Sequence, residues 1–322
     1  MNSRRIRLPI HEATLILVIV IAYLVLNGTS SGTLLSEAAF IGLLGYLSLS
    51  IVIGFSQLTV LAVGQLNLAV GPMGGTVCAV AAVLMAKYQL PVPIALIILI
   101  VLAVALGAVN GLLVNLTELN SFIITLATMT VFVGVQYGLV GTSTVSSYSA
   151  ALKGFGSTNI GGVPLVFLGV LLFAGALSVF YRKTRLGRRS LATGANSQGA
   201  FLLGIVNKRS VLVAHTLSGL CVGVAALLVM TSASGINRSV GGDWLLLSFA
   251  APIIGGIALS GGRAPVLGTL LAATLLRLID VARSTYALDP SWVNFVIGGV
   301  VLVTVALSEL RRRTADRRVR IG

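Results

Sequence analysis

The residue types that perform catalysis are sparse in this sequence, and their spacing assembles no reaction centre. The phosphate-binding pattern G-x-x-x-x-G-K-[ST] is absent, which excludes ATP hydrolysis by that device. His11 and His215 stand alone near the edges of apolar runs, and we interpret both as interfacial residues. Cys78 and Cys221 lie within apolar runs, as small buried side chains do. The sequence therefore indicates no enzyme, no cofactor and no metal site.

Charged side chains are also rare inside the apolar runs. Ion-coupled transporters keep acids or histidines deep in the membrane, whereas most carboxylates here fall at the ends of runs or between them. Arg277 and Asp280 are the exception, because they lie three residues apart within one run and can pair on one helix face. Two interpretations remain open for them: a self-neutralised pair near the outer surface, or part of an outer gate. Without a coupling acid, a transporter must take its energy from a partner.

The apolar runs themselves predict an all-α integral membrane protein. Of the 322 residues, 57% are hydrophobic and 9% charged, and a soluble domain needs more charge than this to cover its surface. A membrane-spanning helix takes about 20 apolar residues. We therefore predict about ten transmembrane helices in a single membrane domain that covers residues 1–322, at approximately 10–27, 37–55, 66–86, 92–114, 121–140, 163–181, 210–231, 244–259, 265–282 and 292–309.

The basic residues predict how these helices are oriented. The net charge is +14, which could suggest nucleic acid, but most of the basic residues fall on one side if both termini are cytoplasmic. That asymmetry is typical of multi-pass proteins of an inner membrane, which keep lysine and arginine in their cytoplasmic loops. The longest inner loop, about 182–209, also holds an uncharged stretch. Asn196 or Ser197 is placed to cap a short helix there, with Gly204 near its end.

Two glycine-rich segments interrupt the apolar pattern. Residues 63–75 combine glycines and Pro72 with Gln65 and Asn67, and irregular backbone at membrane depth is tolerated only inside protein or beside a water-filled cavity. We predict a broken or re-entrant segment near 56–75, with a plain cytoplasmic connection as the alternative. Residues 255–265 resemble this segment faintly. Glycines four residues apart, which predict close helix packing, recur at Gly107 and Gly111, Gly134 and Gly138, and Gly219 and Gly223.

From about residue 37 onward, the chain resembles the ribose-type permeases of bacterial ATP-binding-cassette importers, within the branched-chain amino acid/ribose permease superfamily. Four stretches carry the resemblance in the family's order: Gly64-Gln-Leu-Asn-Leu-Ala-Val-Gly71; Val109-Asn-Gly-Leu-Leu-Val114 with Asn120-Ser-Phe-Ile-Ile-Thr-Leu126; Gly187-Arg188 through Ile205; and Ile254-Gly-Gly-Ile-Ala-Leu-Ser-Gly-Gly-Arg263 with Gly268-Thr269.

The sequence departs from the family pattern at several positions. Asn67 replaces the usual acid, Ala69 replaces the usual serine, and an acid common before the late glycine motif is missing from Trp244-Leu-Leu-Leu-Ser-Phe-Ala250. These changes leave the solute open. Gly199 stands where an alanine is usual, which suggests a small change at the contact with the ATPase.

The resemblance implies a permease that works with two cytoplasmic ATPase subunits, an extracytoplasmic solute-binding protein and a second permease subunit, identical or different. It also implies that the inner loop is a coupling segment, with candidate ATPase-coupling residues at Arg188, Gly194, Asn196, Gly199, Ala200, Gly204 and Ile205. The solute expected from the resemblance is a monosaccharide or polyol. The alternatives are an amino-acid or signalling-molecule permease of the same family, and an ATPase-independent secondary transporter or facilitator.

A neutral, hydroxyl-rich solute needs amides and hydroxyls along its path, because these both donate and accept hydrogen bonds. The candidate pathway residues at span depth are Gln65, Asn67, Asn110, Thr125, Thr128, Gln136 and Asn294. Hydrogen bonding between helices is the competing explanation for each of them. We rank Gln65 and Asn67 first, because their surrounding backbone is rich in glycine.

Overall fold

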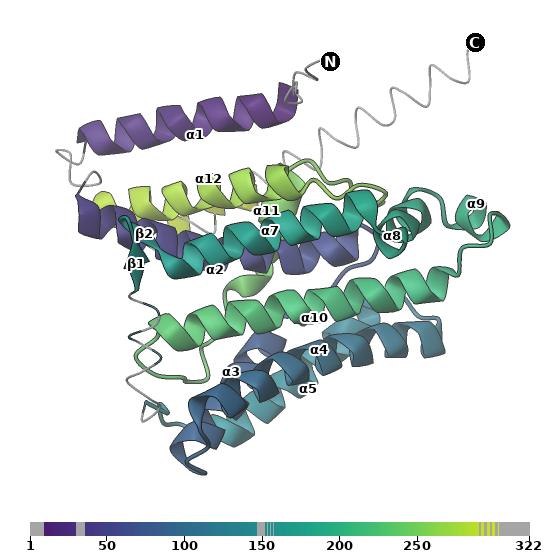
Figure 1. The fold of residues 1–322 in the computed structure, drawn as a ribbon, viewed down its shortest axis with the longest axis horizontal. Helices are drawn as coiled ribbons and strands as arrows, with labels where there is room; N and C mark the ends of the chain where they lie inside the picture. Colours follow the sequence, from purple (N-terminus) through teal and green to yellow (C-terminus); the bar gives the residue numbers. More distant parts are fainter. Residues whose placement is uncertain are drawn as a thin grey trace.

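A computed structural model describes residues 10–29, 36–146 and 158–289, together with a few single residues in 152–156 and 291–302. The predictions for the two termini and for Asn294 lie outside the described residues. The described chain is a helical bundle with a single β-hairpin at one end (Figure 1). Its elements are α1 (Ile10–Thr29), α2 (Glu37–Leu61), α3 (Val70–Ala86), α4 (Val92–Thr117), α5 (Ser121–Val140), β1 (Asn159–Ile160), β2 (Val163–Pro164), α7 (Leu165–Lys183), α8 (Arg185–Ala195), α9 (Ser197–Leu202), α10 (Asn207–Ser232), α11 (Trp244–Ile254) and α12 (Val266–Thr285).

Each of the first nine predicted spans coincides with a helix of the bundle, and the tenth, at 292–309, falls mostly outside the described residues. Six of these helices, α1, α2, α4, α5, α7 and α10, are long and apolar enough to cross a membrane, and α3 and α11 are shorter apolar helices. The span expected at 244–259 was too long, because α11 ends at Ile254 and residues 255–265 are irregular. Gly256, Gly261 and Gly262 there have positive φ angles, which end a helix readily.

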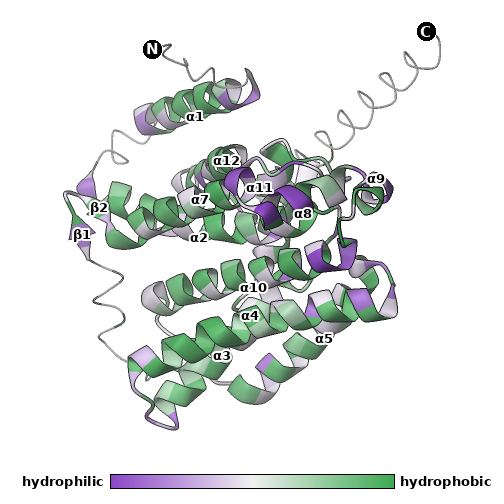
Figure 2. Ribbon diagram, turned by 45° about the vertical axis from the view of Figure 1, so that its right-hand side comes forward, coloured by the Kyte–Doolittle hydropathy of each residue, from purple (hydrophilic) through white to green (hydrophobic). Residues whose placement is uncertain are grey.

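The long helices run side by side, and the molecule has two distinct ends (Figure 1). One end, here called the α8–α9 end, carries those two helices, and the other, the hairpin end, carries β1 and β2, which pair antiparallel with Ile160 opposite Val163. Figure 2 shows hydrophobic residues along the long helices and hydrophilic residues gathered on α8 and at the start of α10. This polarity matches a bundle whose long helices lie in lipid and whose α8–α9 end lies in water.

Helices α2 and α10 form the centre of the bundle. In α10, 61% of the most apolar window is buried inside the protein, against 11% in α1. Helix α10 packs most extensively against α4, where Gly107 and Gly219 face each other. A β-carbon at Gly107 would lie 2.8 Å from the Cα of Gly219, so the two backbones touch. The packing predicted for these glycines is confirmed, whereas a β-carbon at Gly134 or Gly138 would meet nothing within 4 Å.

Candidate functional site

The break between α2 and α3 lies at the α8–α9 end and turns back into the bundle. Residues 62–69 are not helical, and Gly64 has a positive φ angle of 73°. The chain then runs extended beside the first turns of α5. Ser121 Oγ accepts a hydrogen bond from the amide of Leu66 at 2.9 Å, and Thr125 Oγ1 accepts one from the amide of Leu68 at 3.1 Å. Two hydroxyls of α5 thereby replace the partners that a helix would have supplied.

Asn67 lies at the centre of this segment and is completely buried. Its side chain donates to Ser218 Oγ on α10 at 3.1 Å and accepts from the amide of Ala69 at 3.0 Å. With its amide oriented by its partners, Gln57 of α2 donates to the carbonyl oxygen of Asn67 at 2.9 Å and accepts from its N–H at 3.2 Å. Asn67 therefore ties α2, the irregular segment and α10 together, and in this conformation it faces protein.

Asn110 and His215 form a second buried polar group, between α4 and α10. Both side chains are completely buried, and neither has a hydrogen-bond partner among the described residues. Gly107 and Gly111, which flank Asn110 on α4, both contact His215. The interpretation of His215 as interfacial was wrong, because α10 begins at Asn207 and places it more than two turns inside the helix.

Two further candidate pathway residues, Gln136 and Thr128, lie farther along α5. Gln136 sits near the hairpin end of α5 and donates to the carbonyl oxygens of Asn237 at 3.2 Å and Val240 at 3.0 Å. The hydroxyl of Thr128 donates to the carbonyl oxygen of Thr125 within its own helix at 3.3 Å. The structure thus brings Gln65, Asn67 and Thr125 together, with Thr128 one turn further along α5 and Gln136 near the hairpin end of that helix.

Gln65 lines a cavity at the α8–α9 end. The cavity measures about 360 Å³ and is bounded by the irregular segment, by the α4–α5 turn and by Leu259. Glu118 at its rim pairs with Lys208 of α10 at 2.6 Å. The hydrogen bond and the charge of Lys208 lower the pKa of the Glu118 carboxyl. An exposed ion pair therefore lies at the rim of the cavity. The side chain of Gln65 lines this cavity, whereas the buried side chain of Asn67 does not.

The predicted short helix of the inner loop is confirmed as α9. Asn196 caps it by accepting from the amide of Gly199 at 2.8 Å, and Gly204 follows it with a φ angle of 74°. Ala200 is buried, Gly199 is half-buried, and Arg188 is exposed, with Nη1 donating to the carbonyl oxygen of Lys183 at 2.9 Å. Four large apolar side chains project from this part of the chain into solvent: Phe201, Leu202, Leu203 and Val206, exposed by 70%, 84%, 82% and 62%.

Three glycine-bearing stretches meet where α8 contacts the irregular segment, and we call residues 62–64, 194–195 and 260–262 the glycine junction. The amide of Gly262 donates to the carbonyl oxygen of Ala62 at 3.0 Å. A β-carbon at Gly194 would overlap that same oxygen and lie 2.6 Å from the nitrogen of Gly262. A β-carbon at Gly64 would lie 2.9 Å from the carbonyl oxygen of Ser260. Backbone touches backbone here, so the stretches cannot shift independently.

Sequence reasoning missed several residues of this site. Gln57, Ser121 and Ser218 hold the irregular segment, yet they come from three helices, and only the fold shows that they converge. The sequence also predicts no role for Phe201, Leu202 and Leu203. Their position at the end of a capped six-residue helix is a signal that could have identified them, since so short a helix cannot bury every face.

Comparisons with known proteins bear on what this arrangement does. Residues 34–305 match the family described as branched-chain amino acid transport system / permease component. The D-allose transport system permease protein AlsC of Escherichia coli (strain K12) is 29% identical over 263 residues, 82% of this chain and 81% of that protein. The autoinducer 2 import system permease protein LsrC of Salmonella choleraesuis (strain SC-B67) is 29% identical over 310 residues, 95% and 88%. The xylose transport system permease protein XylH of Escherichia coli (strain K12) is 26% identical over 360 residues, 93% and 92%. No solved structure matches the chain.

Proposed function

The chain belongs to the branched-chain amino acid transport system / permease component family, and from that membership we propose that it carries a monosaccharide or polyol through the membrane in an ATP-binding-cassette importer. It is a multi-pass protein of the bacterial inner membrane, with apolar helices that suit that location. As a permease it is a transport subunit and not an enzyme, so ATP is hydrolysed in separate subunits. The family match over residues 34–305 carries the permease role, and the sugar permeases among the relatives support the solute class.

The orientation that we propose places the α8–α9 end in the cytoplasm. Arg182, Lys183, Arg185, Arg188 and Arg189 gather there, and positive residues favour the cytoplasmic side. With ten spans and both termini in the cytoplasm, β1 and β2 face the extracytoplasmic side. A solute-binding protein would then deliver its cargo to the hairpin end.

For coupling, we assign the ATPase contact to α9 and its exposed apolar side chains. Large apolar residues that project into water mark a surface for a partner, and Leu202 is the most exposed of them. ATP-driven movement of α8 and α9 would reach the irregular segment through the glycine junction, where Gly194 touches Ala62. The proposed coupling residues are Arg188, Gly194, Asn196, Gly199, Ala200, Gly204 and Ile205, extended now to Phe201–Leu203.

The proposed pathway passes beside the irregular segment. Gln65 lines a cavity in this conformation, while Asn67 and Thr125 are buried next to it and would meet the solute only when the segment moves. Four further residues would contact the solute in other conformations of the transport cycle: Asn110, Thr128, Gln136 and Asn294. A second permease subunit, of the same or a different sequence, completes the assembly that we propose.

The solute class follows from the relatives. Their names give D-allose, galactose and xylose as transported solutes, which are neutral and rich in hydroxyls. An import permease for autoinducer 2 covers 95% of this chain at 29% identity, and this favours a signalling molecule as the second candidate.

Reconstituted vesicles test the proposal. Vesicles with this permease, its ATPase subunits, a matched binding protein and internal ATP should accumulate one of D-allose, D-galactose, D-xylose or autoinducer 2. Vesicles that hold the permease alone should not. Accumulation or equilibration without the ATPase subunits would refute the ATP-driven mechanism and favour a secondary transporter or facilitator.

A further inference from the structure

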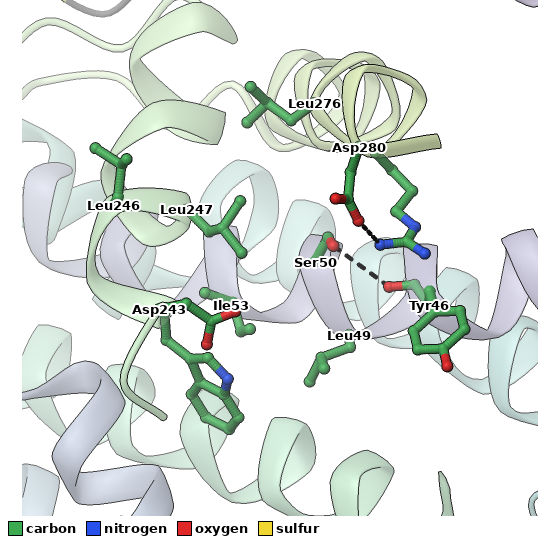
Figure 3. Close-up of a pocket in the computed structure, with 11 residues that line it drawn as sticks. Tyr46, Leu49, Ser50, Ile53, Asp243, Leu246, Leu247, Leu276 and Asp280 are labelled. Carbon is green, nitrogen blue, oxygen red and sulfur yellow. Dashed lines mark hydrogen bonds and ion pairs between the residues drawn. The ribbon is translucent and has the colours of Figure 1, made fainter. Parts of the chain in front are cut away.

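We propose that the cavity enclosed by α2, α11 and α12 is a solute subsite within one permease subunit, selective for a neutral, hydroxyl-rich molecule. The proposal rests on the transport function proposed above and names residues that would contact the solute. The cavity measures about 300 Å³ (Figure 3), and none of its lining residues belongs to the irregular segment 62–69 or to α9. A volume of that size is at the lower end of small-molecule sites and accommodates one sugar ring.

The walls of the cavity combine three charged side chains with the hydroxyl-bearing Tyr46 and Ser50 and with apolar side chains. Asp280 and Arg277 belong to α12, and Asp243 lies at the start of α11. Arg277 Nη1 pairs with Asp280, and its guanidinium lies 4.5 Å from the ring centre of Tyr46. In Figure 3, Asp280 and Asp243 face the cavity from opposite sides, with Leu247 and Ile53 between them.

The mixture of charges selects the class of ligand. Arg277 and Arg283 balance the carboxylates of Asp243 and Asp280, so the cluster has no net charge and offers no excess counter-charge to a cation or an anion. A polyol satisfies both kinds of group, because each hydroxyl donates to a carboxylate and accepts from a guanidinium. The apolar face of a sugar ring can rest on the leucine side chains and on the Trp244 indole, which also lines the cavity.

Ionisable side chains in membrane helices are costly and mark cavities or pathways. Those of Arg277 and Asp280 are only 21% and 30% exposed, in the part of the chain where α12 packs on α2 and α11. The Nε of Arg277 is buried and has no hydrogen-bond partner among the described residues. Both carboxylate oxygens of Asp280 have a partner, one in Arg277 and one in Arg283, and the partial exposure of the pair leaves room for a hydroxyl of a ligand to join it.

One wall of the cavity lies against the start of α3. Trp244 packs its ring directly against Gly74 of α3, where a β-carbon would overlap the ring. The same residue contacts Gly71, one turn from Asn67. Trp244 therefore separates the cavity from the α3 end of the irregular segment, and its displacement would join the two spaces.

Uptake kinetics in cells that express the whole importer provide the first test. Leu247→Trp fills the cavity, whereas Leu245→Trp adds the same bulk to α11 at a position that does not line it. We expect Leu247→Trp to raise the KM for the transported sugar or abolish its uptake, and Leu245→Trp to leave both unchanged.

Asp280→Asn should raise the KM by about tenfold or more, since hydrogen bonds to charged groups are the stronger ones. Asp289→Asn is its control, because Asp289 is an acid that does not line this cavity.

Binding can be read directly from tryptophan emission. The chain has two tryptophans, so the full-length Trp292→Phe variant in lipid nanodiscs reports on Trp244 alone. D-allose, D-galactose or D-xylose should change the emission saturably, and D-glucosamine and D-gluconate should not at equal concentration.

The two tests separate the two proposals. A wild type that imports a sugar, with unchanged kinetics in Leu247→Trp and Asp280→Asn, overturns the subsite and leaves the transport function standing. If the wild type imports neither these sugars nor autoinducer 2, the transport proposal fails, and the emission titration then decides the subsite by itself. No saturable change with any neutral sugar, or an equal change with the charged analogues, overturns it.

Discussion

Gly194, in the last turn of α8, lies directly against the carbonyl oxygen of Ala62, which follows α2 by one residue. The same oxygen accepts a hydrogen bond from the amide of Gly262 at 3.0 Å. One backbone atom of the irregular segment 62–69 therefore contacts both α8 and the irregular segment 255–265. This contact connects the proposed ATPase-facing helices with the segment that carries Gln65 and Asn67.

Gly194→Ala should disrupt this junction. The added β-carbon would overlap backbone that cannot rotate away, and overpacking of this kind costs on the order of 1–3 kcal/mol. We expect a large loss of solute uptake and of solute-stimulated ATP hydrolysis. Gly175→Ala is the control, since a β-carbon there meets nothing within 4 Å. Wild-type coupling in Gly194→Ala would show that movement reaches the irregular segment by another route.

Leu202→Glu should prevent binding of the ATPase subunit without unfolding the permease. Leu202 is 84% exposed, so its replacement disturbs only what docks on it. Co-purification of the ATPase in detergent measures the effect, with Gln198→Glu as an exposed polar control on the same helix. Gly199→Glu and Ala200→Asp should also abolish transport. Because Ala200 is buried, Ala200→Asp should act by displacing α9 from its packed position. Normal recovery of the ATPase with Leu202→Glu would place the contact elsewhere.

Asn67→Ala and Gln65→Ala should have different effects. Asn67 is fully buried and hydrogen-bonded to Ser218, and interhelical contacts of this kind contribute about 1 kcal/mol in membrane proteins. Its loss should lower the thermal unfolding temperature in nanodiscs. Gln65 lines a cavity, so Gln65→Ala should alter uptake kinetics and leave that temperature unchanged. Equal melting temperatures for the two variants would contradict the roles assigned to these residues.

Gly219→Ala should destabilise the α4–α10 contact. A β-carbon at Gly219 would overlap the carbonyl oxygen of Ala103, and relief requires the two helices to separate. We expect a lower unfolding temperature and reduced amounts in the membrane. Gly134→Ala, on the open face of α5, should behave as wild type. If both variants unfold at the wild-type temperature, the close crossing does not limit stability.

Single cysteines should report the proposed orientation. In a background with Cys78→Ala and Cys221→Ala, Gln198→Cys at the α8–α9 end should react with an impermeant thiol reagent only in inverted membrane vesicles. Asn159→Cys in β1 should react only in intact spheroplasts. Labelling of both positions from the same side would refute a protein that spans the membrane between these ends.

Much of the helical architecture follows from the sequence, because in lipid every backbone polar group needs an internal partner and long apolar runs therefore become helices. The first nine predicted spans coincide with helices. The start of α9 at the capping residue Asn196 and its end before Gly204 could be predicted as well, because both depend on neighbouring residues alone. The packing of Gly107 against its partner helix was likewise predictable in kind, since close approach in lipid needs small residues.

Only the tertiary structure decided what the polar residues do. The sequence ranks Gln65 and Asn67 together, two residues apart, yet one lines a cavity and the other is enclosed by Gln57 and Ser218. His215 appeared interfacial until the start of α10 placed it against α4. Whether a side chain meets water, lipid or protein depends on helices that are distant in sequence. Local patterns do not contain those contacts, because they arise from how rigid helices pack in three dimensions.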